Sequence, residues 1–349
     1  MQSTRRRLRF AVPALFTLLM VFVATTAQAQ SESNDLTHLG IEELMEVQII
    51  PIDVLGKHIH PKGEWMVTYQ YMGMAMDGNR IGTEEVTVDE VLADYMVSPT
   101  NMSMNMHMAE VMYGLTDSLT LMAMTSYVQL EMDHVMRTGM RFTTQSEGLS
   151  DIELMAHWAF YESKRHRFIY SGGLSLPTGS IEEKGITPMG NVVLPYPMQL
   201  GSGTYDVNQG VGYVGSTTNW GWGVDAHTTL RTGTNSREYT LGDVFETSAW
   251  LARRLTPWAA LNVELLSHHW GNIEGADPSL RPGMVPTADP TLRGGSKLDF
   301  VFGVSFMVPS GTLKNNRLFI DGNLPVQRDL NGPQLQGTGG VRVGWEWRF

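Results

Sequence analysis

The chain has 349 residues, with 25 lysines and arginines against 36 acidic residues, 36 glycines, 23 methionines and no cysteine. The lack of cysteine excludes a disulfide scaffold, a zinc ribbon, an iron–sulfur site, a thiol nucleophile and a lipidated N-terminal cysteine. The formal net charge is −11 and no basic block occurs. Nucleic acid is therefore not expected as a partner, because phosphate binding needs clustered lysine and arginine.

Residues 1–29 have the pattern of a secretory signal peptide. Four arginines precede an apolar stretch, and Ala27-Gln28-Ala29 supplies the small residues of a cleavage site. The alternative is an uncleaved membrane anchor, but the cleavage pattern directly after a short apolar run favours removal near Ala29. No later run of about 18 apolar residues occurs, so no transmembrane helix is predicted. These features predict export in a Gram-negative bacterium.

Residues 30–62 predict a periplasmic leader. Asp35 precedes a short helical pattern that ends near Met45, and Pro51 and Pro61 interrupt the rest. The pattern from Leu36 to Met45 resembles the segment before the plug of TonB-dependent receptors. The chain is too short for the large barrel and plug of that family, so the resemblance implies at most a periplasmic contact element.

From residue 63 to residue 349 apolar residues alternate with polar ones, which predicts an all-β, transmembrane, antiparallel up-and-down barrel. About 12 strands are expected, each of a length that suits a tilted strand crossing a bilayer. The predicted strands are 64–76, 103–115, 118–130, 149–161, 167–177, 202–214, 220–232, 240–253, 258–270, 295–308, 317–325 and 336–349.

The predicted connections alternate between long loops and tight turns. The long ones are 77–102, 131–148, 178–201, 233–239, 271–294 and 326–335. Long loops at one end and short turns at the other are typical of outer-membrane barrels, with both termini at the periplasmic end. Loops 178–201 and 271–294 are the predicted constrictions, and the first has an apolar tip, Val193 to Tyr196, that is expected to fold inward.

The C-terminal strand alternates up to the last residue. Trp345, Trp347 and the terminal Phe349 share one face with Val341 and Val343. This pattern is similar to the signal read by the outer-membrane barrel assembly machinery, which we therefore expect as a partner together with outer-membrane lipid. Aromatic residues at the strand ends are expected to form interfacial girdles.

The alternation also predicts which side chains face the lumen. If apolar faces meet lipid, the opposite parity points inward and lines a path for a small-molecule solute. The candidate lumen residues are Met72, Met74, Met76, Met104, Met106, Met108, Glu110, Met122, Met124, Glu153, Met155, His157, Asp225 and His227. Three consecutive strands and part of a fourth would share a methionine-lined wall.

The methionines are locally enriched, since 15 of the 23 lie between Met66 and Met140. Three interpretations of this enrichment remain open. Thioethers select Cu(I), and the acidic loop 77–102 would concentrate cations nearby. Alternatively, methionine is adaptable apolar lining for greasy or aromatic solutes, or the methionines face lipid. The candidate metal ligands are Met104, Met106, Met108, Met122, Met124 and His157. Otherwise no cofactor is expected.

Catalytic motifs are missing from the sequence. It contains no G-x-S-x-G elbow, no H-E-x-x-H and no serine–histidine pair at a plausible strand spacing, so no enzyme activity is expected. His58, His60, His268 and His269 are interpreted as surface or interface histidines. Glu264, Asp225 and Asp299 fall on the lumenal parity, where pairing with arginines is expected.

A further motif lies in the middle of the chain. Leu176-Pro177-Thr178-Gly179 ends one predicted strand, and Leu200-Gly201-Ser202-Gly203-Thr204-Tyr205-Asp206 opens the next. This pattern resembles the outer-membrane barrels grouped as the MetA pathway of phenol degradation. The resemblance implies a transporter of small hydrophobic, often aromatic compounds.

The sequence therefore predicts an outer-membrane channel for the passive passage of small hydrophobic or aromatic solutes. One alternative is a copper-handling barrel that uses the methionine wall. Another is a closed structural barrel without transport.

Overall fold

The computed structural model describes residues 59–308, 310–311 and 313–349. The predicted signal peptide and residues 30–58 of the predicted leader lie outside the described residues. The chain divides into two units, Met1–Gln48 and Ile49–Phe349, and the described residues all belong to the second. In this described part, no helix is long and apolar enough to span a membrane.

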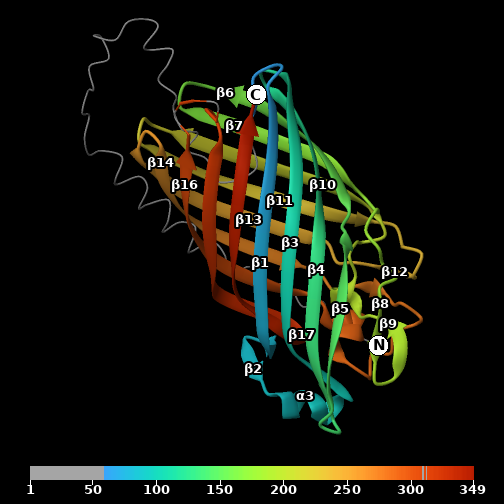
Figure 1. Ribbon diagram of the computed structural model, residues 1–349. Coiled ribbons are helices and arrows are strands. Elements are labelled where there is room, and N and C mark those ends of the chain that lie inside the picture. The colour runs from blue at the N-terminus through green and yellow to red at the C-terminus, as the bar shows by residue number, and fades with distance from the viewer. Residues whose placement is uncertain (1–58, 309, 312) are drawn as a thin grey trace, which may run out of the picture. The chain divides into compact units, whose positions relative to one another are not determined.

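The second unit is a closed antiparallel β-barrel (Figure 1). Eleven strand elements form the ring in chain order, and β17 closes it by pairing with β1. Their bounds are β1 Trp65–Gly82, β3 Val97–Thr116, β4 Leu119–Met136, β6 Ile152–Glu162, β7 His166–Leu176, β10 Tyr205–Ser216, β11 Trp220–Thr232, β13 Val244–Thr256, β14 Ala259–Trp270, β16 Gly295–Met307 and β17 Arg317–Arg348.

The last element replaces two predicted strands. From Arg317 to Leu330, β17 pairs antiparallel with β16, and from Leu330 to Arg348 it pairs antiparallel with β1. A ring of antiparallel neighbours needs an even number of crossings, so β17 crosses the wall twice. The prediction of a loop at 326–335 was wrong, because the ladder with both neighbours continues up to the point of reversal.

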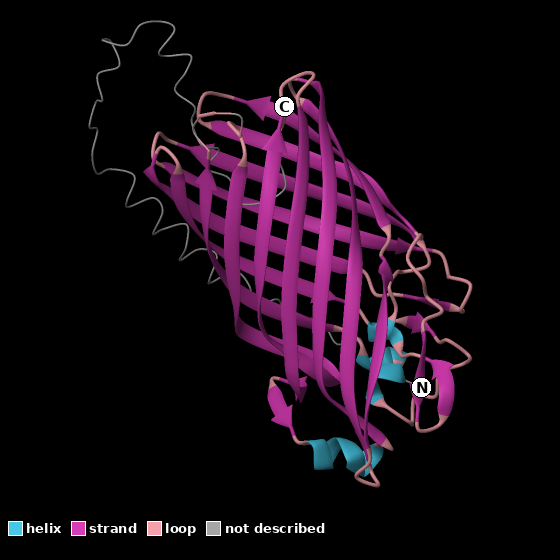
Figure 2. Cartoon of the chain, viewed as in Figure 1, coloured by secondary structure: helices cyan, strands magenta, loops and turns pink. Residues whose placement is uncertain are grey.

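Long connections lie at one end of the barrel, which we call the long-loop end. Tight turns lie at the other, which we call the short-turn end (Figure 2). The predicted alternation is confirmed, and the C-terminus lies at the short-turn end beside the start of β1. The additional elements are β2 Glu84–Val86, α3 Val88–Asp94, β5 Arg141–Leu149, β8 Lys184–Thr187, β9 Gly190–Val193, η2 Tyr196–Met198, β12 Tyr239–Thr240, β15 Glu274–Gly275, η3 Pro286–Ala288 and η4 Pro290–Leu292.

Strands β1, β3 and β4 are longer than predicted, so parts of the predicted loops 77–102 and 131–148 are strand. Polar side chains hold the extension of β4 together with β5. Gln129 Nε2 donates to Glu147 Oε2 at 3.0 Å, and Thr143 Oγ1 donates to Asp133 Oδ1 at 2.5 Å. Apolar alternation stops where these outward residues begin, which is why the pattern underestimated the strand.

Burial along β1 fixes the inner and outer faces. Trp65, Val67 and Tyr69 are exposed, whereas Met66 and Thr68 between them are buried. Met102, Met112 and Met132 are also buried, so these methionines do not face lipid and that interpretation was wrong for them. Exposed tryptophans gather near the short-turn end, as an interfacial girdle requires; they are Trp65, Trp158, Trp220, Trp258, Trp345 and Trp347.

The residues before β1 lie against the inner wall at the short-turn end. His60 is buried, and its backbone N–H donates to Thr120 Oγ1 at 2.8 Å. A Cβ on Gly114 would lie 2.0 Å from the carbonyl oxygen of Pro61. The expectation of a surface position for His60 was therefore wrong, because Gly114 leaves room for the chain inside the wall.

Candidate functional site

The pairing register arranges the predicted methionine wall in rows across neighbouring strands. Directly opposed residues in antiparallel strands share a face, with Cβ atoms about 5 Å apart. Met72 opposes Met106, and Met74 opposes Met104, between β1 and β3. Nearer the short-turn end, Thr68 opposes Glu110, and Thr68 Oγ1 donates to Glu110 Oε1 at 3.4 Å. The register therefore keeps these side chains together on one face of the wall, opposite the exposed Trp65, Val67 and Tyr69.

Toward the long-loop end of the barrel, the loop between β7 and β10 covers this wall. Leu194, Met198 and Leu200 are buried in one cluster with Met102 and Met132, and Met76, Met104 and Met106 pack against that cluster. The predicted inward fold of the apolar tip at Val193–Tyr196 is seen in the burial of Leu194 and Tyr196. Methionine here acts as an adaptable packing surface for a loop.

The proposed metal ligands are not brought together as one set. Met104, Met106 and Met108 follow one another along β3 and oppose Leu130, Val128 and Ser126 of β4. His157 instead shares a 2.8 Å hydrogen bond with Ser171 Oγ through Nδ1. The expectation that no serine–histidine pair lies at strand spacing was wrong, because the register of β6 and β7 places these two residues opposite each other. No group of three or more histidines, aspartates and glutamates placed to hold a metal ion occurs among residues 59–308, 310–311 and 313–349.

A different row does align four thioethers. Met66 opposes Met112, Met112 opposes Met122, and Met122 opposes Met155, across β1, β3, β4 and β6. Three of the four side chains are buried. Only Met122 belongs to both this row and the predicted metal set.

Polar groups fill the inner wall of β10 to β17. Asp206 pairs with Arg231, and Asp321 accepts from Arg342 Nη2 at 2.6 Å. The predicted arginine partner of Asp299 is Arg328. Of the other predicted lumen residues, Asp225 accepts from Ser248 Oγ at 2.6 Å, and the imidazole of His227 lies over Gly210, where a Cβ would come within 2.1 Å of Nδ1.

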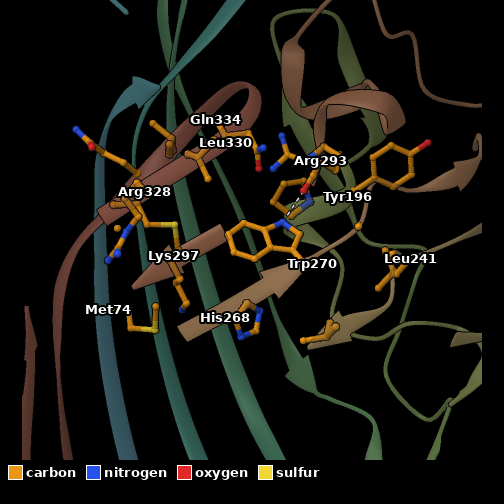
Figure 3. A pocket seen from close by; sticks show the side chains of 18 of the residues that line it. Met74, Tyr196, Leu241, His268, Trp270, Arg293, Lys297, Arg328, Leu330 and Gln334 are labelled. Atoms are coloured by element: carbon orange, nitrogen blue, oxygen red, sulfur yellow. Dashed lines mark hydrogen bonds between the residues drawn. The ribbon is translucent and has the colours of Figure 1, made fainter. Parts of the chain in front are cut away.

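A cavity of about 400 Å³ lies beneath the loops at the long-loop end (Figure 3). Its apolar lining includes Met74 and Met76 of β1, Trp270 of β14 and Leu330 of β17. Trp270 is held by a hydrogen bond from its indole Nε1 to the carbonyl oxygen of Arg293, at 2.7 Å. This size is that of an ordinary small-molecule site, about 300–1,000 Å³.

Two tyrosines from different loops pack against each other beside the cavity, and one of them, Tyr196, lines it. The rings of Tyr196 and Tyr239 pack edge to face with centroids 4.9 Å apart, together with Ile273. Tyr196 also accepts a hydrogen bond from the backbone N–H of Asp277, and Asp277 forms a bidentate pair with Arg237. Burial raises the pKa of Tyr239 to about 12.

Ionisable side chains line the same cavity: Arg231, His268, Arg293, Lys297, Asp299 and Arg328. His268 Nδ1 contacts the carboxylate of Glu246, so its predicted surface position was wrong: its even parity on β14 turns it inward. Of the residues predicted on the lumenal parity, Met74, Met76 and Asp299 line this cavity. Strand parity predicts that Lys297 and His268 point inward. Arg293, Tyr196 and Ile273 come from loops, where alternation does not predict an orientation.

The seam between β1 and β17 has little side-chain cover. Gly73, Gly322 and Gly340 line an outward hollow of about 510 Å³ that shares Met74, Asn323 and Gly339 with the inner cavity. The ladder is irregular here, between Ala75 and Met76. Backbone and small groups are therefore much of what separates the cavity from the outer surface.

Comparison with solved structures identifies the fold. The chain is 14% identical to the COG4313 outer membrane channel from Pseudomonas putida F1, with a TM-score of 0.59 over 85% of this chain and 100% of that one. A TodX monoaromatic hydrocarbon channel mutant (9% identity, TM-score 0.44, 83% and 90% covered) and the Ralstonia pickettii toluene transporter TbuX (8%, 0.40, 83% and 90%) are more distant. No family model and no curated protein matches. The chain thus has an outer-membrane β-barrel fold of the kind found in channels.

Proposed function

We propose that this protein is an outer-membrane channel for the passive passage of small hydrophobic or aromatic solutes. The observation that carries the proposal is the cavity under the loops, lined by Met74, Met76, Trp270 and Leu330. Thioether and indole surfaces accept apolar solutes of varied shape. The resemblance of the segment from Leu176 to Asp206 to the MetA-pathway barrels supports the same solute class.

The proposal includes the location and the assembly route. The apolar outer face and the exposed tryptophans suit the outer membrane of a Gram-negative bacterium, after removal of residues 1–29. The strand that ends in Trp345, Trp347 and Phe349 would be read by the barrel assembly machinery. The side chains in the lumen would bind the solute and exclude water, and no catalytic role is proposed for any of them.

Uptake of a labelled monoaromatic solute tests the proposal, in cells with and without the gene. Met74→Trp fills the cavity and is expected to lower the protein-dependent uptake at least about tenfold, as a steric block requires. Ala75→Trp, on the exposed outer face of the same strand, is the matched control and should retain uptake. Equal uptake with and without the gene, together with no conductance in planar bilayers, would instead indicate a closed structural barrel.

A second candidate function is copper handling, and the row of Met66, Met112, Met122 and Met155 favours it. Neighbouring thioethers on one face can converge on a soft monovalent cation. Titration of the folded protein with Ag(I) and Cu(I) tests this candidate, with Met112→Leu and Met122→Leu as variants of similar volume. Binding no tighter than millimolar would remove it.

A further inference from the structure

Arg293 is a partly buried cation that lines the cavity. It follows η4 and precedes β16, and its side chain lies beside Trp270 and Gln334 (Figure 3). Its Nη1 atom is buried without a hydrogen-bond partner, and within the described ranges its guanidinium forms no ion pair. The Asp289 carboxylate is the acidic group whose charge raises the pKa of Arg293. It accepts hydrogen bonds from Thr291 N at 2.9 Å and from Thr291 Oγ1 at 2.7 Å.

The charge of Arg293 persists at neutral pH. Burial lowers the pKa of Arg293 to about 10, and Asp289 opposes that shift. The group therefore stays protonated in a place where a charge without a partner is unfavourable. An anion that entered the cavity would compensate it.

Lys297 is the second cation with donors to spare. Its Nζ lies 3.9 Å from Asp299 Oδ2, beyond hydrogen-bond distance, and Asp299 also pairs with Arg328. One buried carboxylate thus serves two cations. The other charged groups at the cavity have partners of their own, since Arg231 pairs with Asp206 and His268 with Glu246.

We propose that the cavity holds a small monocarboxylate with an apolar body, whose carboxylate is bound by Arg293 and Lys297. This inference rests on the proposed channel function and narrows its solute class. The apolar body would lie against the indole of Trp270 and the side chains of Met74 and Leu330, which line the same cavity. Guanidinium and ammonium groups form charge-assisted hydrogen bonds to carboxylates, which are about twice as strong as neutral ones.

Ligand-observed NMR titration of the folded full chain in detergent tests the proposal, with empty micelles as the blank. Benzoate is compared with benzamide, which has the same shape and no charge. Wild type is expected to bind benzoate about tenfold more tightly than benzamide, the range of a hydrogen bond to a charged group. Arg293→Gln and Lys297→Gln should each remove most of this preference while benzamide binding is retained, which also reports that the variant is folded.

Arg281→Gln is the matched control, because Arg281 is an exposed cation of the same loop that does not line this cavity. It should keep the preference for benzoate. Equal binding of benzoate and benzamide by wild type, or an unchanged preference in both cavity variants, would overturn the inference and leave the channel proposal intact. If neither compound binds and the gene makes no difference to uptake, both proposals fail.

Discussion

The inner faces of β1, β3 and β4 and of β11 to β17 carry different kinds of side chain. The inner face of β1, β3 and β4 is mainly methionine. On its half nearer the long-loop end, Leu194, Met198 and Leu200 of the loop between β7 and β10 pack against it. The inner face of β11 to β17 carries fixed ion pairs such as Asp299–Arg328 and Asp321–Arg342. The main cavity lies where the two surfaces meet, with Met74 on one side and Lys297 on the other.

The difference shows that one barrel wall can tolerate changes of side-chain shape on one inner face and require fixed charge partners on the other. Methionine is unbranched and packs in many conformations, so a surface made of it accepts changes of shape. A buried ion pair requires both partners, because removal of one leaves an uncompensated charge. Substitutions on the two surfaces should therefore differ in their effects on the free energy of unfolding.

The largest effect is expected for Asp299→Ala. Asp299 is buried and holds Arg328, which is also buried. Its removal should lower the free energy of unfolding by about 3–5 kcal/mol, measured by urea titration in detergent. Asp329→Ala, an exposed acid on β17, is the control and should change that free energy by less than about 0.5 kcal/mol. Equal effects of the two substitutions would show that the pair of Asp299 and Arg328 does not stabilise the inner wall.

Truncation on the methionine side should follow in size. Met198 is a residue of the loop itself and is fully buried in its contact with the methionine side, so Met198→Ala leaves a cavity and should cost about 2–5 kcal/mol. The loop would open locally, and limited proteolysis should cut between residues 178 and 201 faster. Met189→Ala changes an exposed methionine of the same loop and should leave the cleavage rate unchanged. No change for Met198→Ala would mean that the loop is not held by this contact.

A smaller effect is expected at the short-turn end. A Cβ on Gly114 would meet Pro61 O at 2.0 Å and His60 O at 2.8 Å, both backbone atoms. Gly114→Ala should therefore displace residues 60–63 and cost about 1–3 kcal/mol. Gly283→Ala has no neighbour within 4 Å and serves as the control in the same unfolding experiment. A neutral Gly114→Ala would show that the segment does not need this close approach.

The smallest effect belongs to Met106→Leu. Met106 packs against the loop cluster from the wall, and an exchange that preserves volume usually costs less than about 1.5 kcal/mol. Urea unfolding should detect at most this loss, and uptake of an aromatic solute should be unchanged. A loss as large as that of Asp299→Ala would mean that the methionine side is as demanding as the charged one.

Alternation predicted the barrel and most of its strands because every side chain in a barrel wall must choose between two faces. It was wrong where the outward face is not apolar, as along β4 beyond Gln129, and at 326–335, where the ladder continues to the reversal. The separate interpretation of His60 and His268 as surface or interface histidines did not use the strand parity, and both side chains are turned inward.

The sequence by itself therefore determined the barrel class, the two faces of its strands and the loop asymmetry, all of which follow from local periodicity. Only the tertiary structure decided that Arg293, Lys297 and Trp270 meet Met74 in one cavity. These residues come from a loop and from strands far apart in the chain. Their meeting depends on ring closure and loop packing, for which no short-range pattern exists.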